Sequence, residues 1–485
     1  MYELAARLDG CDAFRQREVA PALAQAVRLQ VRATMVLLEP LKQPEVSLYW
    51  TARLADDSDF SPEDPLALDY LAQQVGLWLF PTLTTRTSRA QYYAVVLYGL
   101  HLVERTIEKH ALPADDNTRT QLFEQWERFW ALALMESLGG ALGRGNPDTI
   151  RGVRGLKRAW SPGDAPLRLD FPLISRQSEL GALGAYLNSL RDIGLVIAGT
   201  LRPSPAARAI LEAFWDEPDA SARSSRYEAY ALTALDPTLK KRVIDRKYTG
   251  LTLAAVGERS RLSCLVGRQR TVQQTRLYDT LFTRARDPIT LPCSELIRRA
   301  AKDQVTDPEQ VLANALAGTW GSVEATLREH LVLALTFGRA FREILTCFNA
   351  AYGAATDNGW MASRRLLVGA AFPPVAHDTL RKACSELLDS PLAARLKQLP
   401  VHGAAFLSLV AQLRDAPRDQ ALVHLLSYHL RVQQERGHGG SWLREDGDKV
   451  VVVRTSYTGH LANVGFPPLK IPIVRSLLID MGRCS

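Results

Sequence analysis

Apolar residues recur at helical spacing along most of the chain. They lie mostly three or four positions apart over residues 17–39, before Pro40, and again over residues 68–80 and from Ser88 onward. A repeat of about 3.6 residues predicts amphipathic helices rather than strands. A further predicted helix carries an aromatic stripe, which helical spacing assigns to the core. The stripe consists of Leu122, Phe123, Trp126, Phe129 and Trp130.

Residues 300–435 are also predicted to be helical. Long apolar helices are expected over residues 323–348 and 404–413, with breaks at glycines such as Gly353 and Gly359. These helices predict a scaffold with a substantial core.

The end of the chain has a different pattern. Asp446-Gly447 separates two extended runs, which indicates a β hairpin, and residues 473–481 predict a final helix. The predicted fold class is therefore mainly α: a multi-domain helical protein with a winged-helix-like module, described next, and a small C-terminal β hairpin.

Residues 171–215 predict a helix, a glycine turn, a short extended ribbon and a second helix. Ser175 is the expected cap of the first helix, Gly194 ends it, and Pro205 helps to start the second. This order resembles the winged-helix modules of bacterial regulators, in which one helix enters the DNA major groove and the ribbon touches the backbone. The resemblance implies either DNA contact or the docking of a protein partner. The phosphate contacts expected on DNA are Arg176, Arg191 and Arg202.

Breakers and composition divide the 485 residues into six predicted segments. They are an N-terminal helical domain (1–138), a Gly/Arg-rich linker (139–170), the winged-helix-like module (171–218), a basic helical region (219–300), a helical scaffold domain (301–435) and a C-terminal β hairpin with a helix (436–485). The linker is either a solvated connector or a loop that touches DNA. Its glycines do not form a phosphate-binding loop, because no strand precedes them and no Gly-Lys-Ser/Thr follows.

The charge balance adds a polyanionic partner to the possibilities. The 59 Lys and Arg exceed the 52 Asp and Glu, which gives a net charge of +7. Arginine predominates, and it suits bidentate phosphate contacts, although a GC-rich genome produces the same bias. The basic residues concentrate between positions 220 and 300, which predicts either a DNA-facing surface or a solvated helical face. The DNA contacts expected there are Arg246, Arg268, Arg270 and Arg276.

Several chemistries and locations are not favoured by the sequence. The six cysteines are scattered without zinc-site spacing, and His424 and His429 are five apart rather than three or four, so no metal or other cofactor is expected. The chain has no secretion signal and no apolar run of about 18 residues, which predicts a cytoplasmic protein without a membrane partner.

Enzyme activity is not the favoured interpretation, but it stays open. Asp245 and Lys247, together with Asp446, Asp448 and Lys449, resemble the carboxylate-plus-lysine sets of metal-dependent nucleases. Their spacing does not match such a set, and turn preference explains the acids of the hairpin.

Residues 79–93 join two predicted helices through a hydroxyl-rich, cationic turn. They read Leu-Phe-Pro-Thr-Leu-Thr-Thr-Arg-Thr-Ser-Arg-Ala-Gln-Tyr-Tyr. One interpretation is a helix–helix corner capped by Thr87 or Ser88, with Arg86 or Arg89 paired to a carboxylate. The other is a phosphate-binding corner.

This segment resembles the signature of an uncharacterised group of bacterial proteins: Leu-Phe-Pro-Gly, a threonine-rich stretch, then Arg-Ala-Arg-Tyr-Phe. Thr82 replaces the usual glycine and Gln91 the second arginine. Members of that group are often encoded in defence islands beside helicases, nucleases or DNA-modification genes. The resemblance implies a biological setting and supplies no catalytic residues.

Together these features predict a non-enzymatic, DNA-engaging or scaffold subunit of a bacterial anti-phage defence complex, which docks a helicase, ATPase or nuclease partner. The expected partners are double-stranded DNA, contacted mainly through its backbone, and the other proteins of the complex. The alternatives are a stand-alone winged-helix transcriptional regulator, which would form a symmetric dimer on a palindromic site, and a metal-dependent nuclease.

Overall fold

The computed structural model divides the chain into two units, residues 1–60 and residues 61–485. The structure describes residues 64–83, 89–138, 140–142, 151–163, 165–214, 226–238, 243–244, 271–437 and 440–484. The helix predicted over residues 17–39 lies outside the described residues.

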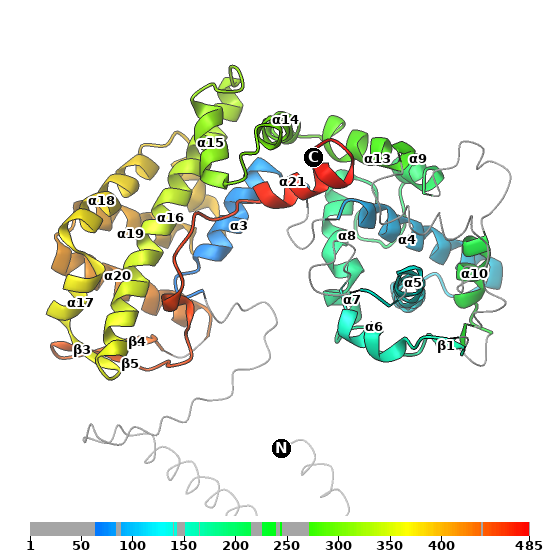
Figure 1. Cartoon of the computed structure of the whole chain (residues 1–485), viewed down its shortest axis with the longest axis horizontal. Coiled ribbons are helices and arrows are strands. Elements are labelled where there is room, and N and C mark those ends of the chain that lie inside the picture. The colour runs from blue at the N-terminus through cyan, green and yellow to red at the C-terminus, as the bar shows by residue number, and fades with distance from the viewer. Residues whose placement is uncertain are drawn as a thin grey trace, which may run out of the picture. The chain divides into compact units, whose positions relative to one another are not determined.

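The regular elements in the first half of the described chain are helices and two strands of two residues (Figure 1). Its elements are α3 (Leu68–Leu79), α4 (Gln91–His110), α5 (Asp116–Ser137), α6 (Val153–Ala159), β1 (Leu167–Arg168), α7 (Gln177–Leu180), α8 (Ala182–Ile193), η1 (Pro205–Ala207), α9 (Arg208–Glu212), α10 (Arg226–Ala234), β2 (Val243–Ile244), α13 (Thr271–Tyr278) and η2 (Asp279–Thr283). Within it, α4 packs against α5, α8, α9 and α13.

The second half contains longer helices and a three-stranded antiparallel sheet. Its elements are α14 (Thr290–Lys302), α15 (Pro308–Leu316), α16 (Ala325–Asp357), β3 (Met361–Ser363), α17 (Arg364–Ala371), α18 (Pro374–Leu388), η3 (Ala393–Gln398), α19 (Gly403–Asp415), α20 (Arg418–Glu435), β4 (Leu443–Asp446), β5 (Lys449–Val452), η4 (Gly459–Leu461) and α21 (Ile471–Asp480). The prediction of a mainly helical protein with a C-terminal hairpin is confirmed.

The aromatic stripe of α5 lies in the core, as predicted. Trp126 is 2 % exposed and Phe123 is 1 % exposed. Gly99 of α4 makes this packing possible, because a Cβ at that position would lie 2.1 Å from the Trp126 ring. The indole N–H of Trp126 donates to the Val95 carbonyl at 3.1 Å, which satisfies the one polar group of this ring.

Residues 139–170 contain more regular structure than a linker. They include α6, and β1 pairs with β2 in the register Leu167 to Ile244. Gly155 allows the close approach of α6 to the chain at Leu173, because a Cβ there would lie 2.3 Å from the Leu173 carbonyl oxygen. Close backbone packing therefore explains this glycine of the predicted linker.

The winged-helix resemblance at residues 171–218 is not confirmed. Two helices, α7 and α8, meet at Gly181 in place of the single helix expected after Ser175, and the N-cap of α7 is Arg176. Gly194 ends α8 with φ +87° as predicted, and Ser204 caps the helical turn begun by Pro205. Within residues 171–214, however, strand pairing is limited to one isolated bridge, from Val196 to Pro203.

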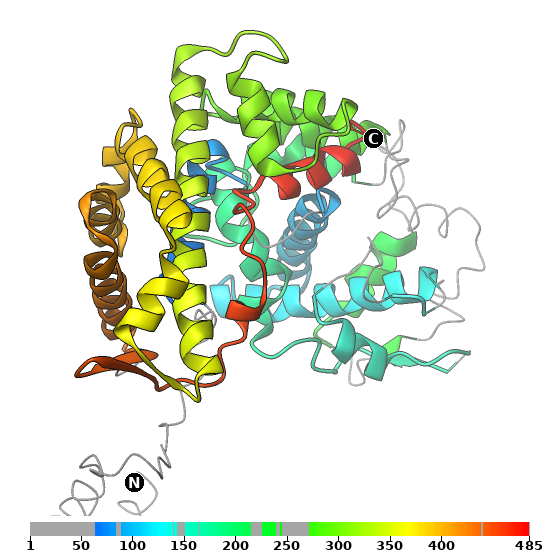
Figure 2. The same cartoon turned by 60° about the vertical axis from the view of Figure 1, so that its left-hand side comes forward.

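Helices α17, α18 and α3 pack on the long helix α16, and α19 and α20 complete the group. The break predicted at Gly353 is wrong, because α16 runs without interruption to Asp357, and the positive φ of Gly359 marks its end. Figures 1 and 2 both place the three-stranded sheet at one end of these helices. The sheet follows the C-terminal end of α16.

Candidate nucleic-acid interface

The three-stranded sheet has the order β3, β5, β4, so the first strand pairs with the last. Met361 lies opposite Val451, and Arg444 lies opposite Val451 from the other side. The helix α16 precedes β3, α17 follows β3 directly, and α20 precedes the β4–β5 hairpin. Helices α17 and α20 also pack against each other. The third strand was not predicted from the sequence.

The start of α17 fixes the hairpin tip. Ser363 caps α17 by accepting from the Leu366 N–H at 3.3 Å. The Arg364 N–H donates to the Asp448 carbonyl at 2.8 Å, and the Arg364 guanidinium lies 2.8 Å from the Glu445 carboxylate. The hairpin is therefore held to a helix by backbone and side chain, although its tip is exposed.

A buried histidine joins α20 to the hairpin. The N–H of Trp442 donates to Nε2 of His429 at 2.9 Å, so Nδ1 carries the proton, and it donates to the Pro65 carbonyl at 2.8 Å. His429 is fully buried, and burial lowers its pKa to about 4. This neutral side chain connects α20, the segment before β4 and the start of α3. It is a core histidine with both nitrogens bonded.

We expect the stability of the chain to fall on acidification because of His429. Its pKa is lowered from 6.5 to about 4, so between these values the unfolded chain binds a proton that the folded chain excludes. Unfolding is thereby favoured as pH falls, by about 3 kcal/mol at pH 4. Denaturant titrations of the parent and of His429→Phe measure the effect. The pH dependence of the variant should be shallower, and parallel curves for the two proteins would contradict this role.

The outer face of α20 carries a stripe of hydrogen-bonding side chains. The stripe consists of Gln420, His424, Ser427, Arg431 and Gln434, at alternating spacings of four and three. His424 is half-buried and the others are exposed. The opposite face, which includes Leu425, Leu426 and Val432, is buried. Arginine, glutamine and serine are among the side chains that contact base edges in the major groove.

The hairpin, which follows this helix in the chain, exposes two cations among three acids, Glu445, Asp446 and Asp448. Arg444 lies on β4 and Lys449 begins β5, where it is opposite Asp446 in the register.

Arg431 on α20 pairs with Glu435 at 2.7 Å, and both side chains are solvent-accessible. Exposed pairs of this kind contribute about 0–1 kcal/mol, so they open readily for another anion.

The arginines predicted to contact DNA are not brought together by the described structure. Arg176 lies 3.4 Å from Glu179, and Arg202 lies 3.3 Å from Glu104. Arg191 donates to the Thr200 carbonyl at 2.7 Å and so holds its own turn. Arg276 is exposed on α13. The remaining predicted contacts, Arg246, Arg268 and Arg270, lie outside the described residues.

The residues considered for nuclease chemistry do not form a described site. Asp446, Asp448 and Lys449 are exposed around the hairpin turn, and Asp245 and Lys247 lie outside the described residues. Within the described ranges, His, Cys, Asp and Glu do not gather in groups of three or more that could hold a metal ion. Each described helix is too short or too polar to cross a membrane.

The corner at residues 79–93 contains the internal ion pair that one interpretation predicts. Arg89 Nε lies 3.0 Å from a carboxylate oxygen of Asp480 at the end of α21, and the two side chains are 11 % and 7 % exposed. The Ala90 N–H donates to the same carboxylate oxygen at 2.9 Å. A negative charge at the start of α4 suits the helix dipole. Arg86, Thr87 and Ser88 lie outside the described residues.

A buried lysine ties the same corner to the start of α21. Lys470 donates through Nζ to the Phe80 carbonyl at 2.8 Å and to the Leu83 carbonyl. It is 4 % exposed, and burial lowers its pKa to about 7. Ser189 of α8 donates to the Thr82 carbonyl, which joins a third element to the corner. Lys470 at the start of α21 therefore holds Phe80 and Leu83, and Asp480 at its end holds Arg89 and Ala90.

Comparisons of the sequence with family models and with curated proteins, and of the structure with solved structures, give no match.

Proposed function

We propose that this chain engages double-stranded DNA through α20 and the β4–β5 hairpin. The observation that carries the proposal is the topology of the sheet, in which β3 pairs with β5, the second strand of the hairpin. Helices precede and follow β3 in the chain, and α20 precedes the hairpin. A winged-helix module has this order of helix, strand, two helices and hairpin, and its first strand pairs with its last. Here α18 and α19 are inserted between the second and third helices.

In a winged-helix module the helix before the hairpin enters the major groove, and we propose α20 for this role. It directly precedes the hairpin, packs on α17, and is positioned by the contact of His429 with the segment before β4. Its outer stripe offers amide, imidazole, hydroxyl and guanidinium groups, which match the donors and acceptors of base edges. Arg444 and Lys449 would contact phosphates beside the groove.

The proposed setting is a bacterial anti-phage defence complex, with a helicase, ATPase or nuclease as the docked partner. Its support is the resemblance of residues 79–93 to the Leu-Phe-Pro and Arg-Ala signature. The polar contacts that fix this corner give it a structural role in the chain itself. The partner is testable by co-purification of the products of neighbouring genes with the tagged full-length chain.

DNA engagement is tested by fluorescence anisotropy with the full chain, a labelled 30-base-pair duplex and a salt series. We expect Arg444→Glu with Lys449→Glu to weaken binding at least tenfold and to reduce the salt slope by about two, because two phosphate contacts are lost. The matched control is Lys302→Glu with Lys397→Glu, which makes the same charge change at two exposed lysines outside α20 and the hairpin.

A second pair tests the stripe of α20. Gln420→Ala with Ser427→Ala keeps the net charge, so we expect it to reduce discrimination between a selected sequence and random DNA while non-specific binding stays unchanged. If the hairpin variant and the control variant lose the same DNA affinity, net charge alone explains the effect. A loss in Arg176→Glu with Arg276→Glu, and none in the hairpin variant, would move the interface to residues 171–300.

A further inference from the structure

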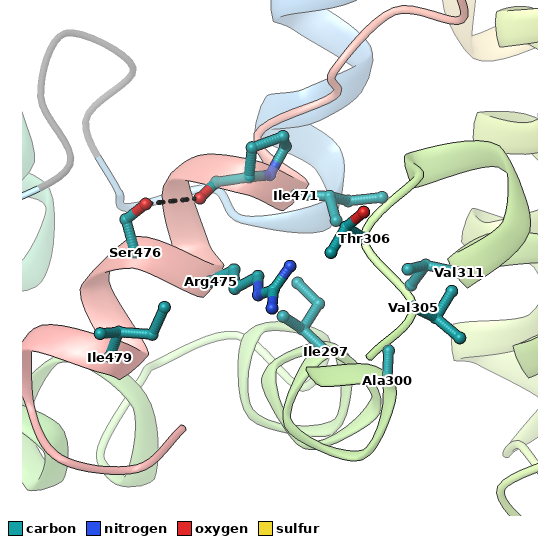
Figure 3. Close-up of a pocket in the computed structure, with 10 residues that line it drawn as sticks. Ile297, Ala300, Val305, Thr306, Val311, Ile471, Arg475, Ser476 and Ile479 are labelled. Atoms are coloured by element: carbon teal, nitrogen blue, oxygen red, sulfur yellow. Dashed lines mark hydrogen bonds between the residues drawn. The ribbon is translucent and has the colours of Figure 1, made fainter. Parts of the chain in front are cut away.

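A groove of about 300 Å³ lies between α14, the start of α15 and α21 (Figure 3). Its walls are mostly aliphatic and include Ile297, Val305, Val311, Ile471 and Ile479. This volume is at the lower end of the range for small-molecule sites in proteins. It corresponds to roughly ten volumes of a liquid water molecule, and so to a ligand of about ten non-hydrogen atoms.

One cation lines this groove. Figure 3 shows the Arg475 side chain extending from α21 toward Ile297 of α14, between the aliphatic walls. Nε of Arg475 is buried, and no group within the described residues accepts a hydrogen bond from it. The two other polar side chains in the lining are Ser476, whose hydroxyl donates to the Pro472 carbonyl at 3.0 Å, and the exposed Thr306. A buried donor without an acceptor is unfavourable, and a bound anion would relieve this cost.

We propose that this groove binds a small apolar carboxylic acid, with its carboxylate on Arg475 and its chain against the aliphatic walls. The guanidinium fork matches a carboxylate in two parallel hydrogen bonds, and aliphatic walls bind a chain through burial of apolar surface. Inorganic phosphate is a poorer fit, because it would place its remaining oxygens against Ile297 and Ile479. The aliphatic walls and the single cation therefore favour a ligand with one anionic group and an apolar chain.

The test uses the full chain and three eight-carbon probes: octanoate, 1-octanol and octylamine, with inorganic phosphate as a fourth. We expect octanoate to raise the melting temperature and to give saturable binding in calorimetry, with the alcohol at least tenfold weaker and the amine and phosphate without effect. Arg475→Gln replaces the guanidinium with a shorter, neutral amide and so removes the charge. It should weaken octanoate binding by about tenfold or more, because the lost hydrogen bonds are charge-assisted.

Two further variants separate ligand binding from folding. Arg483→Gln removes an arginine of the same C-terminal segment that stacks on Tyr278 outside the groove, and it should leave octanoate binding unchanged. Thr306→Trp places a bulky ring at an exposed lining position and should block binding while the chain stays folded. Equal affinities for octanoate and 1-octanol, or unchanged octanoate binding in Arg475→Gln, would overturn the proposal. None of these readouts involves DNA, so the result stands apart from the proposed DNA engagement.

Discussion

Replacing Asp480 with alanine is expected to destabilise the folded chain by about 3–5 kcal/mol, as is typical when one partner of a buried ion pair is removed. Arg89 would keep a positive charge at 11 % exposure, and the Ala90 N–H would lose its carboxylate acceptor. The first turn of α4 and the last turn of α21 would then be joined by the hydrogen bond from the Gln91 side chain to the Asp480 carbonyl, without the ion pair. Denaturant unfolding measured by circular dichroism gives the free energy of unfolding.

Asp480→Asn provides a graded comparison, because its amide oxygen still accepts from the Ala90 N–H while the negative charge is lost. We expect a smaller loss than in Asp480→Ala. Asp446→Ala, at the exposed hairpin turn, is the matched control and should change stability by only about 0.5 kcal/mol. A similar small effect of Asp480→Ala would show that this contact does not hold the corner together.

This ion pair illustrates how much of the corner could be predicted from the sequence. The short segment indicated two helices joined by a turn, and a paired arginine was one of its two interpretations. It did not indicate the partner, because Asp480 lies 390 positions after Ala90 and belongs to the last helix. The periodicity of a short segment cannot identify a partner so distant in the sequence. The same separation applies to Lys470, whose acceptors are the carbonyls of Phe80 and Leu83.

Helix positions were predicted well where an apolar stripe faces the core, and less well at glycines. Gly353 was expected to break α16, but a glycine within a helix costs only about 1 kcal/mol relative to alanine. The burial of neighbouring Phe348, Ala351 and Tyr352 exceeds that cost, so the helix continues. Tertiary packing therefore decides the outcome at this position.

The candidate DNA interface was missed for two physical reasons. β3 has three residues, too few to show the alternation that reveals a strand, and four α-helices and η3 lie between it and its pairing partner β5. The polar stripe of α20 was present in the sequence, but a polar helix face is usually only solvated. It becomes a candidate for base contact because the helix precedes the β4–β5 hairpin and β3 pairs with that hairpin to form a three-stranded sheet.

Arginine content was also an uncertain guide to DNA contact, because many arginines form internal pairs. Arg119 lies 2.6 Å from Glu104, and Arg436 lies 3.1 Å from Asp64, with both of these arginines largely buried. The Arg191 guanidinium donates a hydrogen bond to the Thr200 carbonyl. The net charge of the sequence includes these arginines, although in the folded chain they pair with internal carboxylates and carbonyls.

Lys470 is expected to make the chain more stable as pH rises from 7 to about 10. Burial lowers its pKa from 10.5 to about 7, so in this window the folded chain has released a proton that the unfolded chain still binds. The cost of burying the charged ammonium is complete below pH 7 and disappears above pH 10.5. The gain across the window is as much as about 4 kcal/mol.

Lys470→Met isolates this contribution, because methionine has an unbranched side chain without a titrating group. The variant leaves the Phe80 and Leu83 carbonyls without their donor, so it should be less stable than the parent, and the difference should grow between pH 7 and 10. Lys382→Met, at an exposed position on α18, should follow the parent at every pH. A constant difference between the parent and Lys470→Met would mean that Lys470 stays charged in the folded chain. In that case the two carbonyls hold the ammonium strongly enough to offset its burial.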